Sequence, residues 1–150
     1  MHRSIGFVPL LLALALFSGL GFAQAPSKNV PYLELNPPQP TETQGKVEVL
    51  EFFWYGCPHC YALEPVLNPW IQKLPREVSF RRVPAIFNEQ WGVAGRVFYA
   101  LEAINEEARV HSALFDAIHK EGLRITDESA MAAWLGKHGV DLEKYKAAYR

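Results

Sequence analysis

Cysteine is scarce in this sequence, because its 150 residues contain only Cys57 and Cys60. One closely spaced pair is poorly explained as a staple, since closing so short a loop removes little entropy from the unfolded chain. A zinc centre needs about four ligands, and no second close pair of cysteine or histidine follows. The scarcity directs attention to the chemistry of the pair itself.

An excess of positive charge is also missing, with 15 Lys and Arg against 16 Asp and Glu and a net charge of -1. Proteins that bind nucleic acids usually carry a basic surplus to neutralise phosphates, so we expect no nucleic-acid partner. Hydrophobic residues make up 49% and charged residues 21% of the chain. These proportions favour one globular domain over a disordered chain or a multi-pass membrane protein.

Long apolar runs are absent except at the N-terminus. Arg3 precedes an apolar stretch at 8–17, and small residues follow as far as Ala23. This layout is typical of a secretory signal peptide, which we predict at residues 1–23. An uncleaved anchor is the alternative, since 5–23 could nearly span a bilayer. Export would place the two cysteines where thiol pairs tend to be oxidised.

The mature chain is expected to open with a proline-rich lead-in at 24–45, in which 32–35 could form a short edge strand. Residues 46–54 include β-branched and aromatic residues and are apolar along nearly their whole length, which is typical of a strand buried on both faces. A second strand is predicted at 77–83. A helix between them would complete a right-handed β-α-β unit covering 46–87.

The connecting helix is predicted to begin at Cys57, to be bent by Pro65 and Pro69, and to be finished by Pro75. From residue 88 onward only helical patterns occur, so we predict an all-helical domain at 88–150. Residues at helical spacing form four stripes: Val93, Val97, Ala100, Leu101 and Ile104; Val110, Leu114, Ala117 and Ile118; Met131, Trp134, Leu135 and His138; and Leu142, Tyr145 and Tyr149. The expected caps are Thr126, Asp127 and Asp141, and the expected stops are Gly122 and Gly139.

The start of this helix would activate the first cysteine. Cys57 occupies the cap and Pro58 the first helical position, where a missing N–H costs nothing. The free N–H groups and the positive end of the helix dipole then favour thiolate over thiol, and His59 can add a positive charge. We therefore predict that Cys57 is the reactive thiol.

The second cysteine lies on the same face of the helix. At a separation of three residues the β-carbons of Cys57 and Cys60 should be about 5 to 6 Å apart, near enough for a disulfide. A stabilised thiolate favours the dithiol form, which makes the disulfide an oxidant. The sequence therefore predicts disulfide donation, with Cys60 as the more buried partner.

Other interpretations of the cysteine pair remain open. A metal site would need further ligands, and His111, His119 and His138 are expected to be solvated or rim residues on scattered helical segments. Covalent haem attachment would need a histidine directly after Cys60, where Tyr61 stands. A structural disulfide is the remaining alternative.

An acid stands out in the first strand. Glu51 lies in a largely apolar segment six residues before Cys57, and burial there should raise its pKa unless it is paired. Two roles are open: a proton acceptor and donor for Cys60, or a structural acid that is paired with Arg82 of the next strand.

The segment "VLEFFWYGCPHCYALEP", together with a strand ending in "FRRVPAIFN" and the helices after it, resembles the DsbA family of bacterial thiol:disulfide interchange proteins. The resemblance covers about 47–150. It implies a thioredoxin-like α/β fold with an inserted all-helical domain. It also implies that Cys57 is the nucleophile, Cys60 the resolving thiol, His59 a stabilising neighbour and Glu51 the buried acid.

The resemblance further implies a monomeric periplasmic enzyme with no cofactor other than its Cys57–Cys60 disulfide. Its expected partners are unfolded secreted polypeptides and a quinone-linked membrane oxidase of the DsbB type. A thiol reductase or isomerase of the same superfamily is the alternative. Family members return after the helices to a cis-proline loop, two strands and a last helix, so we expect this sequence to be a fragment.

Overall fold

The structure is a computed structural model that describes residues 32–150, so the predicted signal peptide at 1–23 lies outside the described residues. Residues 40–150 form one compact unit. In the remaining described stretch, 32–39, the expected edge strand is wrong: 32–35 have no regular secondary structure and are exposed. A strand needs a hydrogen-bonding partner, and within the described residues the sheet has only two strands.

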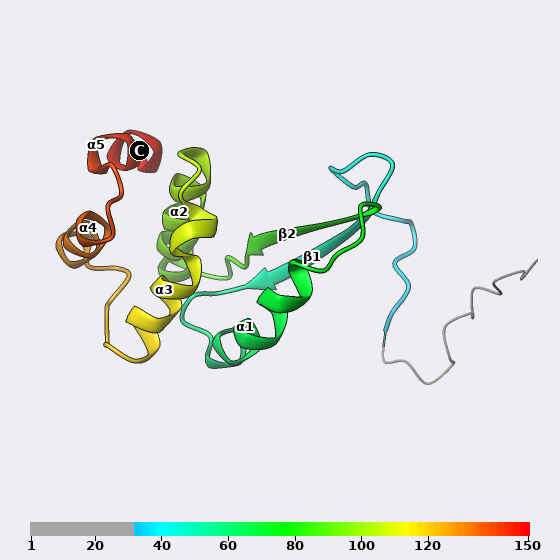
Figure 1. Ribbon diagram of the computed structural model, residues 1–150, viewed down its shortest axis with the longest axis horizontal. Helices are drawn as coiled ribbons and strands as arrows, with labels where there is room; N and C mark the ends of the chain where they lie inside the picture. Colours follow the sequence, from blue (N-terminus) through cyan, green and yellow to red (C-terminus); the bar gives the residue numbers. More distant parts are fainter. Residues whose placement is uncertain (1–31) are drawn as a thin grey trace, which may run out of the picture. The chain divides into compact units, whose positions relative to one another are not determined.

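The compact unit opens with a β-α-β crossover, shown in Figure 1. Strand β1 (Val47–Phe53) pairs in parallel with β2 (Val78–Pro84), and helix α1 (Pro58–Ile71) connects them. The register places Glu51 directly beside Arg82. Helix α1 continues through both internal prolines but ends at Ile71, before the predicted stop at Pro75, which lies in the turn leading to β2.

The two faces of β1 differ in exposure. Phe53 is buried, whereas Phe52 is 67% exposed and Leu50 is 38% exposed. The prediction of a strand buried on both faces is therefore wrong. Within residues 40–150 the helices cover only the face of Phe53, and side chains alternate strictly across a strand.

Four helices follow: α2 (Glu89–Ala103), α3 (Glu107–His119), α4 (Glu128–Lys137) and α5 (Leu142–Tyr149). Of the predicted caps, Asp127 is confirmed because it accepts from the backbone N–H of Ala130, and Asp141 because it accepts from those of the first turn of α5. Thr126 lies one residue before the cap of α4. Gly122 and Gly139 both adopt positive φ after a helix, where L-residues with a side chain are strained.

The core joins the crossover to the helices. Phe53 and Tyr55, at the end of β1, pack with the buried faces of α2 and α3, including Phe98, Leu101 and Phe115. In Figure 1 the carboxyl ends of both strands lead toward these helices. The loop from β1 to α1 is thus anchored in the buried apolar core. Among residues 32–150, no helix is long and apolar enough to cross a membrane.

Candidate active site

Cys57 caps helix α1. Its backbone is extended, Pro58 takes the first helical position, and Sγ accepts a hydrogen bond from the backbone N–H of Cys60 at 3.4 Å. The N–H of Cys57 donates to the carbonyl of Trp54 at 2.9 Å, which closes a tight turn between β1 and α1. Both cysteines are free thiols and half-buried. The predicted cap geometry is confirmed.

The two thiols differ in acidity. Burial raises the pKa of Cys57, but hydrogen bonds from Cys60 and from the backbone of His59 outweigh it, so the net pKa is lowered. Burial raises the pKa of Cys60 to about 11, and the nearby Cys57 and the negative charge of Glu51 add to the increase. Cys57 is therefore the thiol that ionises first.

The side chain of His59 is exposed. Among the described residues its imidazole makes no hydrogen bond or ion pair, and its effect on Cys57 comes through the backbone N–H. A stabilising role for the His59 charge therefore stays a prediction, as does a role for Pro58 beyond its place in the first turn.

Glu51 is paired with Arg82, its register partner on β2. Arg82 Nε donates to Glu51 Oε2 at 3.1 Å, and both side chains are largely buried, at 10% and 13% exposed. Burial raises the pKa of the Glu51 carboxyl by more than Arg82 lowers it. The ion pair is the one expected if Glu51 is a structural acid. The raised pKa is the property expected if Glu51 is a proton donor.

A third member of this buried charge cluster was not predicted from the sequence. Glu64 lies on α1, where its Oε1 is 3.3 Å from Arg82 Nη2, and Oε2 accepts from Asn68 and Ser112. Burial raises the pKa of Glu64, but His111 and Arg82 outweigh it and hold the pKa at about 2. The sequence feature that could have indicated Glu64 is an acidic residue four positions after Cys60 on the same helix.

The expectation for the histidines is wrong for His111, which is 2% exposed. His111 and His119 both come from α3, and both contact Tyr55 in the turn before Cys57. His111 Nδ1 lies 2.9 Å from the Tyr55 hydroxyl, and His119 Nε2 donates to the Tyr55 carbonyl at 2.8 Å. The burial of His111 was not predicted, because a histidine next to Val110 in the sequence can lie on either the buried or the exposed face of α3.

An aromatic pair flanks the same turn. Trp54 stacks on Trp91 of α2, with ring centroids 4.3 Å apart and an interplanar angle of 7°. A β-carbon on Gly56 would lie 2.5 Å from Cη2 of Trp54, so the stacked position requires glycine there. The residue before Cys57 is therefore fixed by close packing.

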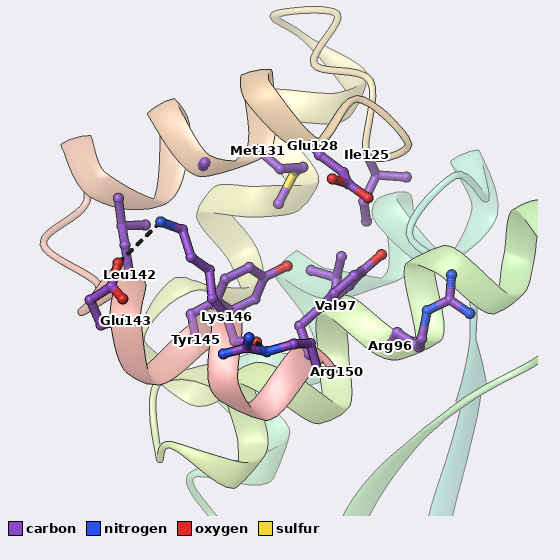
Figure 2. A pocket seen from close by; sticks show the side chains of 12 residues that line it. Arg96, Val97, Ile125, Glu128, Met131, Leu142, Glu143, Tyr145, Lys146 and Arg150 are labelled. Carbon is purple, nitrogen blue, oxygen red and sulfur yellow. Dashed lines mark hydrogen bonds and ion pairs between the residues drawn. The ribbon is translucent and has the colours of Figure 1, made fainter.

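A separate hollow of about 680 Å³ lies between α2, α4 and α5, as Figure 2 shows. Val97, Met131 and Tyr145 contribute to its lining, and Lys146 pairs with Glu143 at 3.1 Å beside it. None of the predicted site residues and no cysteine or histidine lines it. Thiol chemistry therefore belongs to the turn at Cys57. Within the part of the chain that the structure describes, no group of three His, Cys, Asp or Glu side chains could hold a metal ion.

Comparisons with known proteins place this geometry in a family. The chain is 50% identical to the thiol:disulfide interchange protein DsbA of Azotobacter vinelandii over 118 residues, which is 79% of this chain and 55% of that protein. It is 43% identical to DsbA of Pseudomonas aeruginosa over 147 residues, which is 98% of this chain and 70% of that protein. No family model matches the chain.

Solved structures agree. The crystal structure of Pseudomonas aeruginosa DsbA superimposes with a TM-score of 0.74 at 48% identity, covering 79% of this chain and 62% of that one. The oxidoreductase DsbA from Xylella fastidiosa gives 0.66 at 32% identity, covering 71% and 59%. The chain thus spans somewhat over half to about two thirds of these relatives. It has the thioredoxin-like fold with a helical insertion that the resemblance implied, and it belongs to the DsbA family of thiol:disulfide interchange proteins.

Proposed function

We propose that this protein is a thiol:disulfide oxidoreductase that donates the Cys57–Cys60 disulfide to other polypeptides. The observation that carries the proposal is the cap geometry of Cys57, whose Sγ accepts the N–H of Cys60 at 3.4 Å while the pKa of Cys60 rises to about 11. A thiolate stabilised in this way favours the dithiol form, so the disulfide tends to be passed on.

The reaction has two exchange steps. A substrate thiolate attacks Cys57 Sγ, the Cys57–Cys60 bond breaks, and Cys60 leaves and takes up a proton. A second substrate thiolate then attacks the substrate sulfur of the mixed disulfide and expels Cys57 as a stabilised thiolate. The enzyme disulfide gains two electrons, the substrate dithiol loses two, and no cofactor is needed.

Glu51 is proposed as the proton donor and acceptor for Cys60. Burial raises the pKa of the Glu51 carboxyl, which favours its protonated form, and its charge is one of the causes that raise the pKa of Cys60. As Cys60 leaves, a nearby carboxyl can supply the proton that a high-pKa thiolate requires. Arg82 would hold Glu51 in place through the 3.1 Å contact.

Family membership supports a proposal for the setting in which the protein acts. We place the protein in the periplasm after removal of residues 1–23. It would act there as a monomer on unfolded secreted polypeptides and be reoxidised by a quinone-linked membrane oxidase of the DsbB type. Oxidation is favoured over reductase or isomerase action because the lowered pKa of Cys57 makes it a good leaving group.

Two measurements test the proposal. The ultraviolet absorbance of the thiolate during a pH titration should show Cys57 ionising below an ordinary thiol, whose pKa is 9.0. The oxidised protein should also form disulfides in a reduced, unfolded substrate protein. An ordinary Cys57 pKa together with no transfer of the disulfide would leave a structural disulfide as the better interpretation.

A further inference from the structure

Tyr55 is held by α3 at both of its ends. Its hydroxyl lies 2.9 Å from His111 Nδ1, and its backbone carbonyl accepts from His119 Nε2 at 2.8 Å. The ring itself is 1% exposed and packs against Phe53 and Phe115. No other residue of the turn before Cys57 has both its side chain and its backbone bound to one helix among the hydrogen bonds of the described residues.

This residue lies inside the turn that presents the reactive thiol. The bond from the N–H of Cys57 to the carbonyl of Trp54 makes Tyr55 and Gly56 the central residues of a four-residue turn. The carbonyl that His119 binds belongs to the peptide group between them. Fixing this group fixes the direction in which the chain enters Cys57.

His119 is itself fixed in place. Its ring stacks on Tyr61 with centroids 4.6 Å apart and an interplanar angle of 1°, and the Tyr61 hydroxyl donates to Asp116 at 2.7 Å. Tyr61 follows Cys60 directly on α1. One histidine of α3 therefore contacts the chain on both sides of the cysteine pair.

We infer that His119 is a positioning residue for the Cys57 thiolate, holding the carbonyl of Tyr55 so that Cys57 Sγ stays over the first turn of α1. The sulfur depends on its alignment with the first turn, where it accepts the N–H of Cys60 at 3.4 Å. A small rotation of the Tyr55–Gly56 peptide group would weaken this bond and destabilise the thiolate. The inference rests on the proposed function, and it gives helix α3 a part in positioning the reactive thiol.

The test replaces the donor while keeping the ring. In His119→Phe the stack on Tyr61 can persist but nothing donates to the Tyr55 carbonyl. We expect the thiolate pKa of Cys57 to rise by about one unit, and the equilibrium constant for oxidation of glutathione to fall about tenfold. His119→Gln supplies an amide donor and should recover most of both values. His119→Leu is a second variant without a donor, should the phenylalanine variant fail to fold.

His138 offers a matched control on another helix. Its Nδ1 donates to the carbonyl of Trp134 at 2.8 Å, and its ring stacks on Trp134 with centroids 3.9 Å apart. His138→Phe removes an equivalent hydrogen bond from an equivalent stack, but it contacts nothing in the turn before Cys57. It should lower the melting temperature without changing the thiolate pKa or the glutathione equilibrium.

The outcomes separate three cases. If His119→Phe or His119→Leu folds and keeps the parental thiolate pKa and glutathione equilibrium, His119 is merely structural and the inference is overturned. If His119→Gln behaves like His119→Phe, the hydrogen bond is not the cause and the inference also fails. An ordinary thiolate pKa in the unsubstituted protein would instead contradict the proposed function, whatever the variants do.

Discussion

At the scale of single residues, one helix turn gives two chemically identical side chains opposite properties. Cys57 receives N–H groups from the first turn of α1, whereas Cys60 lies one turn further in, where burial dominates. The difference arises from position alone, since a helix has free N–H groups only in its first turn. It is therefore open to a direct test with single substitutions.

Single cysteine variants should differ strongly in alkylation rate. Cys60→Ser keeps the activated Cys57 thiolate, while Cys57→Ser keeps a thiol whose pKa is raised by burial. Near neutral pH we expect iodoacetamide to modify the Cys60→Ser variant at least about tenfold faster, because the thiolate is the nucleophile. Mass spectrometry over time provides the rates. Equal rates in the two folded variants would show that the cap does not activate Cys57.

Glu64 should make stability depend on acid pH. Its pKa falls from an ordinary 4.5 to about 2 in the folded protein. A carboxyl with a depressed pKa contributes stability that is fully present above the unfolded value and is lost as the pH falls through the folded value. The free energy of unfolding should therefore decline between about pH 4.5 and 2.

Urea unfolding of Glu64→Gln checks this assignment. The variant should be less stable near neutral pH by about 1 to 3 kcal/mol, because partners of the buried cluster lose a charged acceptor. It should also lose most of the decline below about pH 4.5. Glu121→Gln is the control, because the side chain of Glu121 is exposed. A decline as steep as in the parent would assign the acid dependence to other carboxyls.

At the scale of elements, the turn from β1 to α1 is held from two sides. Helix α3 binds Tyr55, and α2 supplies Trp91 for the stack on Trp54. The strand alone would leave four residues free to adopt several conformations, so the helices determine the direction in which α1 begins. Elements that carry no cysteine therefore shape the site.

Gly56→Ala should displace Trp54 from Trp91. The new β-carbon would lie 2.5 Å from Trp54 Cη2, a distance that real contacts do not allow. We expect a loss of about 1 to 3 kcal/mol from the strain of overpacking and a change in the near-ultraviolet circular dichroism of the stacked pair. Thermal unfolding and that spectrum are the measurements.

Gly92→Ala is the control for this substitution, since it lies beside Trp91 within α2. Its β-carbon would come no closer than 3.8 Å to Ile86, which is ordinary contact. Alanine inside a helix should stabilise it by up to about 1 kcal/mol and leave the stack unchanged. If Gly56→Ala keeps the parental spectrum and stability, close packing does not require glycine at position 56.

At the scale of the molecule, the local parts of the fold and site were predictable and the long-range parts were not. The order of strands and helices, the cap at Cys57 and the stops at Gly122 and Gly139 follow from neighbours within a turn. The burial of His111 and the exposure of Phe52 depend on which elements cover them. The same sequence pattern is compatible with a buried or an exposed face, because alternation shows which side chains share a face of the strand but not which face other elements cover.

The reduced protein should gain stability relative to the oxidised protein as the pH rises toward 9. The folded pKa of Cys57 is lowered from an ordinary 9.0. A lowered pKa contributes stability that is complete near the unfolded pKa and is lost as the pH falls through the folded one. Only the reduced form has this thiol, so the oxidised form serves as the internal control.

Urea unfolding of both redox forms across this pH range gives the difference in unfolding free energy. Its absolute size also contains the entropy that the disulfide removes from the unfolded chain, but that contribution does not change with pH. The difference should therefore shift in favour of the reduced form between the folded pKa of Cys57 and about pH 9, then reverse above it because the pKa of Cys60 is raised to about 11. A difference that stays constant across the range would mean that folding does not stabilise the Cys57 thiolate, and the driving force for disulfide donation would then be absent.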